Sequence, residues 1–598
     1  MSTSRQIIFT PSGRRGSFPE GTMVLDAARS LGVDLDSVCG GRGICGRCQV
    51  TIGSRPGIEA REDRLSPPGP TETDYRARRP LGEGQRLGCA ALILDDVVID
   101  VPAESQVHRQ VVRKRAEVDA LPVDPVVRLR YIEVAEPDLA SPTGDLERVQ
   151  EALAEQWQLR GLRVLSSVLS ELQVALRKGQ WTVTVAVREE SQIVAVWPGF
   201  RDLALGMAFD VGSTTIAAHL CDLASGAVLA SAGRMNPQIG FGEDLMSRVS
   251  YVMMNEGGAE RLTSVVRRAL DDLIGELVAE TGVKRDDILE LTVVGNPIMH
   301  HLVLGYDPRE LGTAPFALVT TSALETPAAE LGLNVHPGAR VYTLPCIAGH
   351  VGADAAGAVL SEGPHRGDAL QLLVDVGTNA EIVLGNKDRL LAASSPTGPA
   401  FEGAQISSGQ RAAPGAIERV RVAKETLKPR FRVIGQDMWS DEPGFDRSAV
   451  TGICGSGIIE VIAELFLAGV IAADGSIVER PGSDRVVSRE RTFSYVLSEE
   501  PSIEITQNDV RAIQLAKAAL HAGARLLMDH YGVDRVDQIR LAGAFGSHID
   551  PMYAMVLGMI PDCDLNRVSA AGNAAGMGAM MALLSGVARR EIEEVAQR

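Results

Sequence analysis

The spacing of apolar and polar positions changes along the chain, and each change marks a different kind of structure. Near the amino end, RQIIFTPSG predicts a strand, MVLDAARSLG a short helix and DDVVIDVP a second strand. Further on, SPTGDLERVQEALAEQW predicts a capped amphipathic helix, and QWTVTVAVREE an alternating strand. From about Leu203 onward, paired apolar strands alternate with helices. The pattern therefore predicts several domains of mixed α and β structure.

A chain of 598 residues also exceeds what one hydrophobic core supports. We predict a first domain over residues 1–105, a charged linker over 106–125, a small α+β middle domain over 126–202 and a large domain over 203–598. Within the large domain, LALGMAFDVGSTTIAAHLCD and ALQLLVDVGTNAEIVLG share one order: apolar strand, Asp, Val-Gly, Ser or Thr, apolar strand. This internal duplication predicts two lobes.

Charge narrows the choice of partners. The formal net charge is −18, which argues against nucleic acid or an anionic membrane as a partner, because binding phosphates needs clustered Lys and Arg. The amino terminus lacks the apolar core of a secretion signal, so we expect a cytoplasmic protein with reduced cysteines. The uncharged run from Val568 to Ala588 has nearly the length of a membrane span, but its Asn573 and glycines favour a buried helix of a soluble protein.

Three of the eight cysteines lie in one short stretch, CGGRGICGRCQV. The spacing Cys39-x5-Cys45-x2-Cys48, with Cys89 forty residues later, suits four thiolate ligands of a 2Fe–2S cluster. The stretch resembles the 2Fe–2S ferredoxins, closer to the adrenodoxin type than to the plant type, and this implies a β-grasp ferredoxin domain. A structural zinc site and unrelated buried cysteines are the alternatives.

The duplicated phrases are candidate phosphate loops. Glycine permits close approach to phosphate, hydroxyl and N–H groups donate to its oxygens, and Asp holds Mg²⁺ directly or through water. The candidates are Asp210, Gly212, Ser213, Thr214 and Thr215 in the first copy, and Asp375, Gly377, Thr378 and Asn379 in the second.

Further candidates lie near the carboxyl end. Gly543 and Gly546 follow a predicted strand, as expected where the backbone passes under an adenosine. Gln514 and Lys517 can face one side of the preceding helix, either as adenosine contacts or as part of a solvated face. VVGNPIMHHLVLG and AAGNAAGMGAM are predicted to be crossing helices that connect the lobes, with His300 and His301 as core or interface residues rather than metal ligands.

This ordered set resembles the superfamily of acetate and sugar kinases, heat-shock chaperones and actin. The resemblance covers residues 203–598 and implies a two-lobed, actin-like (ribonuclease H-like) ATPase domain. Lobe I would span about 203–367 and 548–598, and lobe II about 368–547. It also implies an ATP and Mg²⁺ site between the lobes, with Asp210 and Asp375 near the metal.

Across the whole chain, the cysteine stretch together with SSPTGPAFEGAQISSGQRAAPGAI, VTGICGSGIIEVIAEL and TQNDVRAIQLAKAAL resembles the reductive activators of corrinoid-dependent methyltransferases and corrinoid iron-sulfur proteins. The resemblance implies an ATP-hydrolysing iron-sulfur reductase that passes one electron from its cluster to an inactive Co(II) corrinoid and restores Co(I). It also implies a corrinoid protein or methyltransferase as acceptor, a reductase or ferredoxin as electron donor, and a homodimer. Glu402 would orient water or reach the corrinoid partner, or be a plain turn carboxylate.

Three other functions stay open. One is an electron carrier in which the two-lobed domain is a regulatory or chaperone-like module. The chain would otherwise be an ATP-dependent, low-potential electron donor to a different enzyme, such as a dehydratase. It would alternatively be a phosphotransferase with a ferredoxin appendage, although no positioned general base is evident in the sequence.

Overall fold

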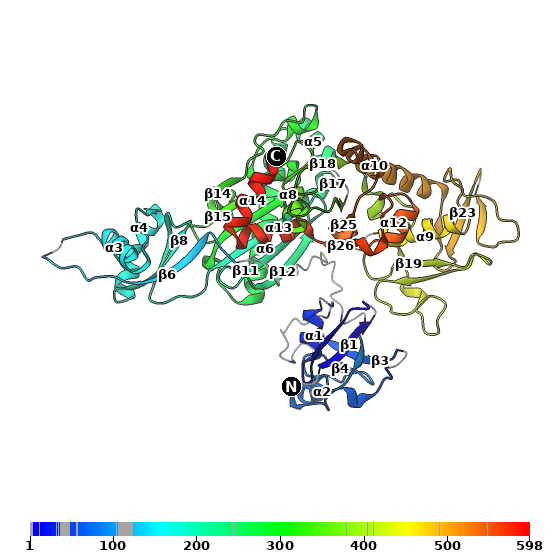
Figure 1. Cartoon of the computed structure of the whole chain (residues 1–598), viewed down its shortest axis with the longest axis horizontal. Helices are drawn as coiled ribbons and strands as arrows, with labels where there is room; N and C mark the ends of the chain where they lie inside the picture. The colour runs from blue at the N-terminus through cyan, green and yellow to red at the C-terminus, as the bar shows by residue number, and fades with distance from the viewer. Residues whose placement is uncertain are drawn as a thin grey trace. The chain divides into compact units, whose positions relative to one another are not determined.

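The computed structural model describes residues 4–10, 12–31, 33, 35, 43, 48–55, 58–102, 105, 123–140, 142–242, 245–377, 379–403, 405–410, 412–489, 491–546 and 548–598. The chain divides into two compact units. One comprises Met1–Val111 and Glu402–Ala512, and the other comprises Val112–Phe401 and Ile513–Arg598. Figure 1 labels the helices and strands in chain order, from blue at the amino end to red at the carboxyl end. Most of the predicted linker, residues 106–122, lies outside the described residues.

The amino-terminal part is a five-stranded mixed sheet in the order β2-β1-β5-β3-β4. Alternate residues of its strands, such as Ile7 and Phe9, pack with Leu25 of α1 in one core. The predicted strands and helix are present, and the β-grasp expectation is confirmed. The elements are β1 (Ser4–Thr10), β2 (Arg15–Pro19), α1 (Val24–Ser30), β3 (Gln49–Gly53), α2 (Pro70–Arg78), β4 (Arg86–Leu87) and β5 (Val97–Asp100).

The middle part is a four-stranded sheet in the order β6-β8-β9-β7 with two helices. The helices are amphipathic, and residues such as Leu153 and Leu176 pack against the sheet. Ala186, Val194 and Ala195 instead join the core of the following sheet. The elements are β6 (Val127–Glu133), α3 (Asp145–Trp157), β7 (Arg163–Val164), α4 (Ser166–Lys178), β8 (Thr182–Arg188) and β9 (Gln192–Pro198).

The next sheet has six strands in the order β12-β11-β10-β13-β15-β14. Its first three strands are antiparallel neighbours, whereas β13 runs parallel to β10, so the carboxyl ends of β10 and β13 lie together. The elements are β10 (Leu205–Val211), β11 (Thr215–Asp222), β12 (Val228–Met235), α5 (Leu245–Met254), α6 (Gly258–Thr281), β13 (Ile288–Gly295), α7 (Pro297–Leu304), β14 (Leu324–Pro327), β15 (Arg340–Thr343) and α8 (Ala353–Glu362).

A second sheet repeats this arrangement in the order β18-β17-β16-β25-β26. Here too a three-strand antiparallel meander is extended by parallel strands, as the duplicated sequence phrases predict. The elements are β16 (Gln371–Val376), β17 (Ala380–Gly385), β18 (Leu390–Ser395), α10 (Gln507–Tyr531), β25 (Gln538–Ala542), α11 (Gly543–Gly546), α12 (Pro551–Val556), β26 (Val568–Gly572), α13 (Ala574–Leu584) and α14 (Gly586–Ala596).

Between β18 and α10 the chain forms two small three-stranded sheets, β20-β19-β21 and β22-β23-β24, and one helix. The helix is strongly apolar, and most of its side chains are buried. The elements are β19 (Ala416–Val422), β20 (Pro429–Val433), β21 (Gly452–Ile453), α9 (Gly455–Leu467), β22 (Val486–Arg489), β23 (Thr492–Ser498) and β24 (Ile503–Ile505).

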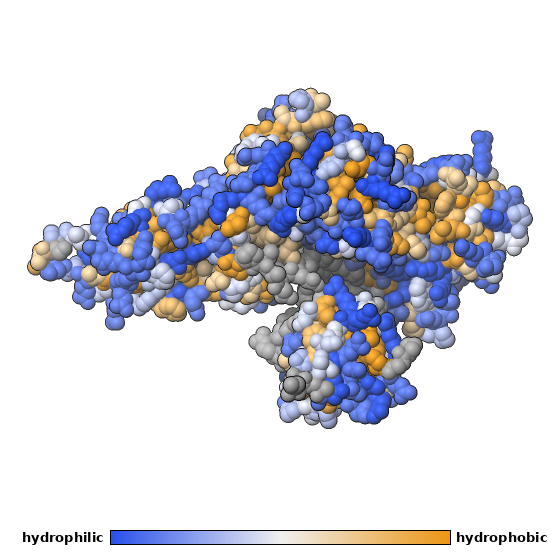
Figure 2. All heavy atoms as spheres, viewed as in Figure 1, coloured by the Kyte–Doolittle hydropathy of each residue, from blue (hydrophilic) through white to orange (hydrophobic). Residues whose placement is uncertain are grey.

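The uncharged run from Val568 to Ala588 forms strand β26, the buried helix α13 and the start of α14. In the described parts of the chain, no helix has both the length and the apolar character needed to cross a membrane. Hydrophilic and hydrophobic residues are mixed over the surface in Figure 2.

Candidate functional site

Two of the four predicted cluster ligands lie in the described part of the ferredoxin-like sheet. Cys48 and Cys89 are both buried in its apolar core. Pairing of β3 with β4 and a 2.7 Å hydrogen bond from the Gly88 N–H to the Cys48 carbonyl bring the two cysteine segments together. Cys39 and Cys45 lie outside the described residues.

The backbone around these cysteines is packed too closely for larger residues. Gly43 has φ +67°, and a Cβ there would lie 2.2 Å from Cγ2 of Thr71. A Cβ on Gly88 would lie 3.2 Å from the Cys48 carbonyl oxygen. Buried sulfur ligands on a close-wrapped backbone fit an iron-sulfur cluster, whose potential depends on burial and on nearby N–H groups.

The first phosphate-loop candidate is the tight turn between β10 and β11. The Gly212 N–H donates to the Thr215 carbonyl at 3.0 Å, and a Cβ on Gly212 would lie 2.7 Å from that oxygen. Asn236, fully buried, donates from its side chain to the Gly212 carbonyl at 2.9 Å and from its backbone to the Thr214 carbonyl at 2.8 Å. The fully buried Arg248 donates to the Ser213 carbonyl.

These contacts fix the carbonyl side of the turn and leave its donors available. Within the described residues, the backbone N–H groups and the hydroxyls of Ser213 and Thr214 have no hydrogen-bond partner. A concave turn with unused N–H groups is a common anion-binding structure. Sequence reasoning missed Asn236 and Arg248, although an arginine in the otherwise weakly charged helix LMSRVSYVMM was a visible signal.

The second candidate is the equivalent turn between β16 and β17. The Gly377 N–H donates to the Asn379 carbonyl at 3.1 Å, and the Thr397 hydroxyl donates to the Gly377 carbonyl at 3.0 Å. Thr378 lies outside the described residues. Asp375, at the end of β16, pairs in register with Glu381 on β17, so both side chains lie on one face of the sheet.

Glycines let the chain segments at the end of the first sheet meet. A Cβ on Gly295 would lie 2.8 Å from the Val211 carbonyl oxygen, and a Cβ on Gly352 would lie 2.6 Å from both the Asn296 Cα and the Gly295 carbonyl oxygen. The start of α8 is thereby held against the carboxyl ends of β10 and β13. Ligands of open α/β sheets bind at such strand ends.

Four carboxylates converge on this region: Asp210 on β10, Asp354 at the start of α8, Asp375 on β16 and Glu381 on β17. Burial, together with the charges of Asp375 and Asp210, raises the pKa of Asp354 to about 7. Burial and the charges of Asp354 and Asp375 likewise raise the pKa of Glu381 well above its usual range. Such shifts indicate a site where negative charge is concentrated.

An all-oxygen set of carboxylates fits a hard cation such as Mg²⁺. Among the described residues, no three His, Cys, Asp or Glu side chains lie close enough together to ligate a metal ion directly. This arrangement agrees with Mg²⁺, which usually keeps several waters and shares its remaining ligands with substrate phosphates.

Sequence reasoning found Asp210 and Asp375 but missed Asp354 and Glu381. Asp354 stands in the phrase GHVGADAAGAV, which has no copy elsewhere in the chain. Glu381 carried a clearer signal, because it is the one charged residue in the apolar strand AEIVLG.

The loop after β25 lies directly against Asp375. Gly543 has φ +85°, and a Cβ there would lie 2.5 Å from Oδ1 of Asp375 and 2.8 Å from the Val376 carbonyl oxygen. Only glycine fits both the backbone conformation and the space. Gly546, at the end of α11, is less crowded, since the nearest atom to its Cβ would be the Leu541 carbonyl carbon at 3.3 Å.

The two polar candidates on α10 lie three residues apart and are both half-buried. Lys517 donates to the Leu557 carbonyl at 2.6 Å and so binds the end of α12. Its ammonium group therefore anchors the segment that follows Gly543 and Gly546.

Glu402 is half-buried at the end of the short helix Pro399–Glu402. The loop after it is compact, because a Cβ on Gly409 would lie 2.0 Å from the Gly403 carbonyl oxygen. Asp509 near the start of α10 holds the same loop, accepting from the Ser407 N–H at 2.7 Å and from its hydroxyl at 3.0 Å.

One prediction about the connecting helices was wrong. The segment AAGNAAGMGAM does form a crossing helix, α13, but its partner is α8 rather than α7. A Cβ on Gly578 would lie 2.0 Å from the Gly357 carbonyl oxygen, so the two backbones touch. Small residues along α8 permit this approach, whereas bulky residues on α7, such as Met299 and Leu302, pack into the core beside α6.

His300 and His301 lie in the core on α7, as predicted. Burial lowers the pKa of His300 to about 4, so it is neutral near pH 7. His301 is hydrogen-bonded at both ring nitrogens, to the Pro297 carbonyl at 2.9 Å and the Val319 N–H at 3.2 Å.

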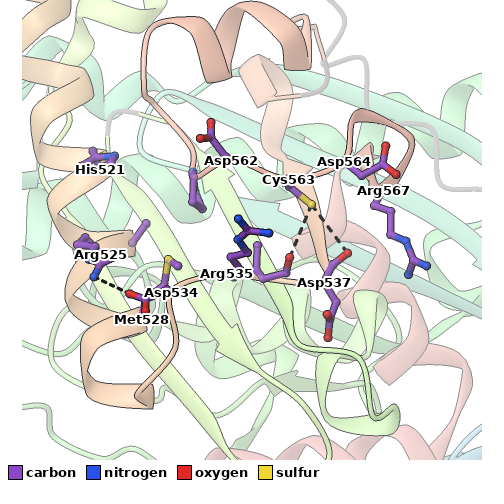
Figure 3. Close-up of a pocket in the computed structure, with 13 residues that line it drawn as sticks. His521, Arg525, Met528, Asp534, Arg535, Asp537, Asp562, Cys563, Asp564 and Arg567 are labelled. Atoms are coloured by element: carbon purple, nitrogen blue, oxygen red, sulfur yellow. Dashed lines mark hydrogen bonds and ion pairs between the residues drawn. The ribbon is translucent and has the colours of Figure 1, made fainter.

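A separate cavity of about 760 Å³ lies beside the second half of α10 (Figure 3). Arg525 and Asp534 form an ion pair at 3.1 Å on one side of it, and Cys563 contacts the Val536 and Asp537 carbonyls. No residue predicted from the sequence lines this cavity, so the candidate site rests on the turns and carboxylates described above.

Comparison with known families assigns each part of the chain. A model of the 2Fe–2S iron-sulfur cluster binding domain matches residues 8–93. The RACo linker region matches 116–202, the RACo middle region 205–367, and the C-terminal domain of RACo, the ASKHA domain, 369–598. The chain thus has a 2Fe–2S domain and an ATP-binding ASKHA domain.

Whole-chain relatives agree. The corrinoid activation enzyme RamQ of Eubacterium limosum is 32% identical over 585 residues, covering 94% of this chain and 90% of the relative. The [Co(II) methylated amine-specific corrinoid protein] reductase of Methanosarcina barkeri is 26% identical over 381 residues, covering 60% of this chain and 66% of the relative.

A solved structure described as a reductive activator for corrinoid, iron-sulfur protein is 32% identical, covers 99% of this chain and 94% of its own, and superposes with a TM-score of 0.71. Matches of this extent show that the protein belongs to the family of reductive activators of corrinoid proteins, to which the cysteine spacing and the paired Asp-x-Gly turns point.

Proposed function

We propose that the protein is an ATP-dependent reductive activator that passes one electron from a 2Fe–2S cluster to the Co(II) corrinoid of a methyltransferase or corrinoid protein, restoring Co(I). The observation that carries the proposal is the combination, in one chain, of buried Cys48 and Cys89 with a two-sheet site of paired turns and converging carboxylates. The names of the two curated relatives support a corrinoid acceptor.

In this proposal Cys39, Cys45, Cys48 and Cys89 hold the cluster, which supplies one-electron transfer when bound. The buried positions of Cys48 and Cys89 would shield it from water and keep its potential low. Gly43 and Gly88 would let the backbone close around the sulfur ligands.

The paired turns bind ATP. With ATP and Mg²⁺ bound, the N–H and hydroxyl groups of Ser213 and Thr214 would donate to phosphate oxygens. Asp210 and Asp375 would hold Mg²⁺ directly or through water, and Asp354 and Glu381 would add to the negative charge around it. Gly543 and Gly546 would let the backbone pass close to the adenosine. Gln514 and Lys517 would lie on the adenosine side of the site, and Glu402 would orient water or reach the corrinoid partner. The other residues that would form the two phosphate turns are Gly212, Thr215, Gly377, Thr378 and Asn379.

ATP is needed because the electron must move uphill. A cluster of the plant type has a potential of about −400 mV, and each ~59 mV of unfavourable gap in a one-electron step costs a factor of ten in the equilibrium constant. ATP binding that favours one arrangement of the two sheets can assist reduction of the acceptor only under one condition. That arrangement must also differ from the other in its affinity for the acceptor. We further propose a reductase or ferredoxin as donor, a homodimer and a cytoplasmic location.

An anaerobic spectroscopic experiment tests the proposal. The protein, a reductant and a Co(II) corrinoid protein are mixed, and the visible spectrum is followed with and without Mg-ATP. We expect a Co(I) signal that depends on ATP. Absence of that signal across several corrinoid partners would refute the proposal, and a phosphorylated small-molecule product would favour a phosphotransferase instead.

A further inference from the structure

Helix α2 of the ferredoxin-like domain ends in a basic surface. Arg76, Arg78 and Arg79 are all exposed on its last turn and cap. Arg78 donates to the Asp74 carbonyl, and among the described residues no carboxylate lies within ion-pairing distance of Arg78 or Arg79. Arg76 is ion-paired with the buried carboxylate of Glu72 at 3.3 Å, so the positive charge of this surface comes mainly from Arg78 and Arg79, with Asp74 as the one exposed acid of the helix.

This surface, the α2 arginines, is connected to the cluster segment by short contacts. The fully buried carboxylate of Glu72 on α2 accepts from Nε of Arg86 at 2.9 Å and from the Leu87 N–H at 3.2 Å. Leu87 is two residues from Cys89. At the start of the helix, Thr71 packs against Gly43 inside the cysteine loop. An electron that enters at α2 therefore enters on a helix that contacts both Gly43 and the strand leading to Cys89.

The charge of α2 contrasts with the rest of the chain. Residues 1–105 carry 13 Arg, no Lys and 14 acidic residues, and are nearly neutral. Residues 106–598 carry 46 basic and 63 acidic residues. A protein that complements the α2 arginines must be acidic, and such a protein is repelled by the remainder of the chain. The electron donor needs to bind only the ferredoxin-like domain. The electron acceptor must also be affected by the state of the ATPase domain.

We propose that the α2 arginines are the docking site for the electron donor, a one-electron redox protein with an acidic surface. One electron passes from the reduced donor to the oxidised cluster, and no covalent bond forms or breaks. The inference rests on the proposed function only for the direction of electron flow, from the donor to the cluster. Electron transfer between donor and cluster can be studied without ATP or a corrinoid protein. Complementary charge would act mainly on the association rate.

The test measures cluster reduction by stopped-flow absorbance, with a fully reduced acidic flavodoxin as the probe. The variants are Arg79→Glu and the double change of Arg78→Glu with Arg79→Glu. Arg15→Glu is the matched control, because it makes the same charge reversal on β2, at the opposite edge of the sheet from β4. Dithionite, a small reductant that needs no docking surface, reports whether each cluster is intact.

We expect the second-order rate constant with flavodoxin at low salt to fall about three- to fivefold in Arg79→Glu and about tenfold or more in the double variant. At high salt the difference should largely vanish, since the Debye length falls to about 3 Å near 1 M. Arg15→Glu should stay within about twofold of wild type, and dithionite rates should not change.

Two results would overturn the proposal. One is a double variant that flavodoxin reduces as fast as it reduces the Arg15→Glu control. The other is an unchanged flavodoxin rate combined with slower ATP-dependent corrinoid reduction, which would assign the α2 arginines to the acceptor or to the ATPase domain. Failure of the proposed function alone would leave the flavodoxin measurement unaffected.

Discussion

Exchanging Gly543 for Ala should disable the nucleotide site through a single methyl group. The new Cβ would lie 2.5 Å from Oδ1 of Asp375 and 2.8 Å from the Val376 carbonyl oxygen. The backbone atom belongs to a central strand and cannot yield easily, so the Asp375 carboxylate must move. Ordinary contact begins at 3.4 Å, which requires a displacement of about 0.9 Å.

The change has two separable costs. An L-residue at φ +85° costs about 1–2 kcal/mol of folding stability. A displacement near 1 Å in a group that orients Mg²⁺ and phosphate can cost up to about a hundredfold in function. We therefore expect Mg-ATP affinity to fall about ten- to hundredfold, or about 1.4–2.7 kcal/mol.

Gly532 supplies the matched control. It has φ +86°, but a Cβ there would meet no atom within 4 Å. Gly532→Ala should lose similar folding stability in urea titrations while Mg-ATP affinity by calorimetry stays near the wild-type value. Corrinoid reduction at limiting ATP should follow the affinity in both variants.

Wild-type Mg-ATP affinity in Gly543→Ala would refute the reasoning, because it would mean that Asp375 does not contribute to the nucleotide site. Equal losses in both would refute it too, since backbone strain alone would then explain the effect. A loss confined to Gly543→Ala, reversed in part by high Mg²⁺, would support it.

Three further changes test other parts of the molecule. Burial and neighbouring charges raise the pKa of Asp354 from 3.8 to about 7. In urea titrations without Mg²⁺, the free energy of unfolding of the wild-type protein should therefore decrease as the pH rises from 3.8 to about 7. Asp354→Asn should reduce this pH dependence. Cys48→Ser should abolish the visible absorption of the cluster while calorimetry shows Mg-ATP affinity within about twofold of wild type; unchanged absorption would argue against Cys48 as a ligand. Gly578→Ala should cost about 1–3 kcal/mol by overpacking the α8–α13 crossing, whereas Gly586→Ala, whose nearest neighbour would lie at 3.4 Å, should cost little.

The sequence predicted those features that repeat or have a local period. The two Asp-x-Gly turns were identifiable because each joins apolar strands in the same order, and the cysteine loop because three cysteines lie within ten residues. The site is less predictable where it depends on packing. Asp354 joins the other carboxylates only because Gly352 lets α8 begin against the end of β13, a contact between segments more than fifty residues apart.

The connecting helices show the same limit. Both VVGNPIMHH and AAGNAAGMG begin with Gly-Asn after a strand, and Asn296 and Asn573 each accept a hydrogen bond from the helix that they precede. Local sequence therefore predicts two similar helix starts correctly. It does not show which helix can approach α13 closely, because that depends on the small side chains facing the crossing.

The middle part is coupled to the first sheet by buried charge, which limits how the nucleotide site can move. Arg188 on β8 lies 3.3 Å from Glu290 on β13, and Arg589 on α14 lies 2.8 Å from the same carboxylate. All three side chains are almost completely buried, and both arginines also contact Glu325 on β14, so the four charges form one network that joins the two sheets. Since β13 pairs with β10, which carries Asp210, any nucleotide-driven displacement of that strand must carry the middle sheet with it. The middle part is therefore mechanically coupled to the candidate phosphate turn between β10 and β11 rather than a passive spacer.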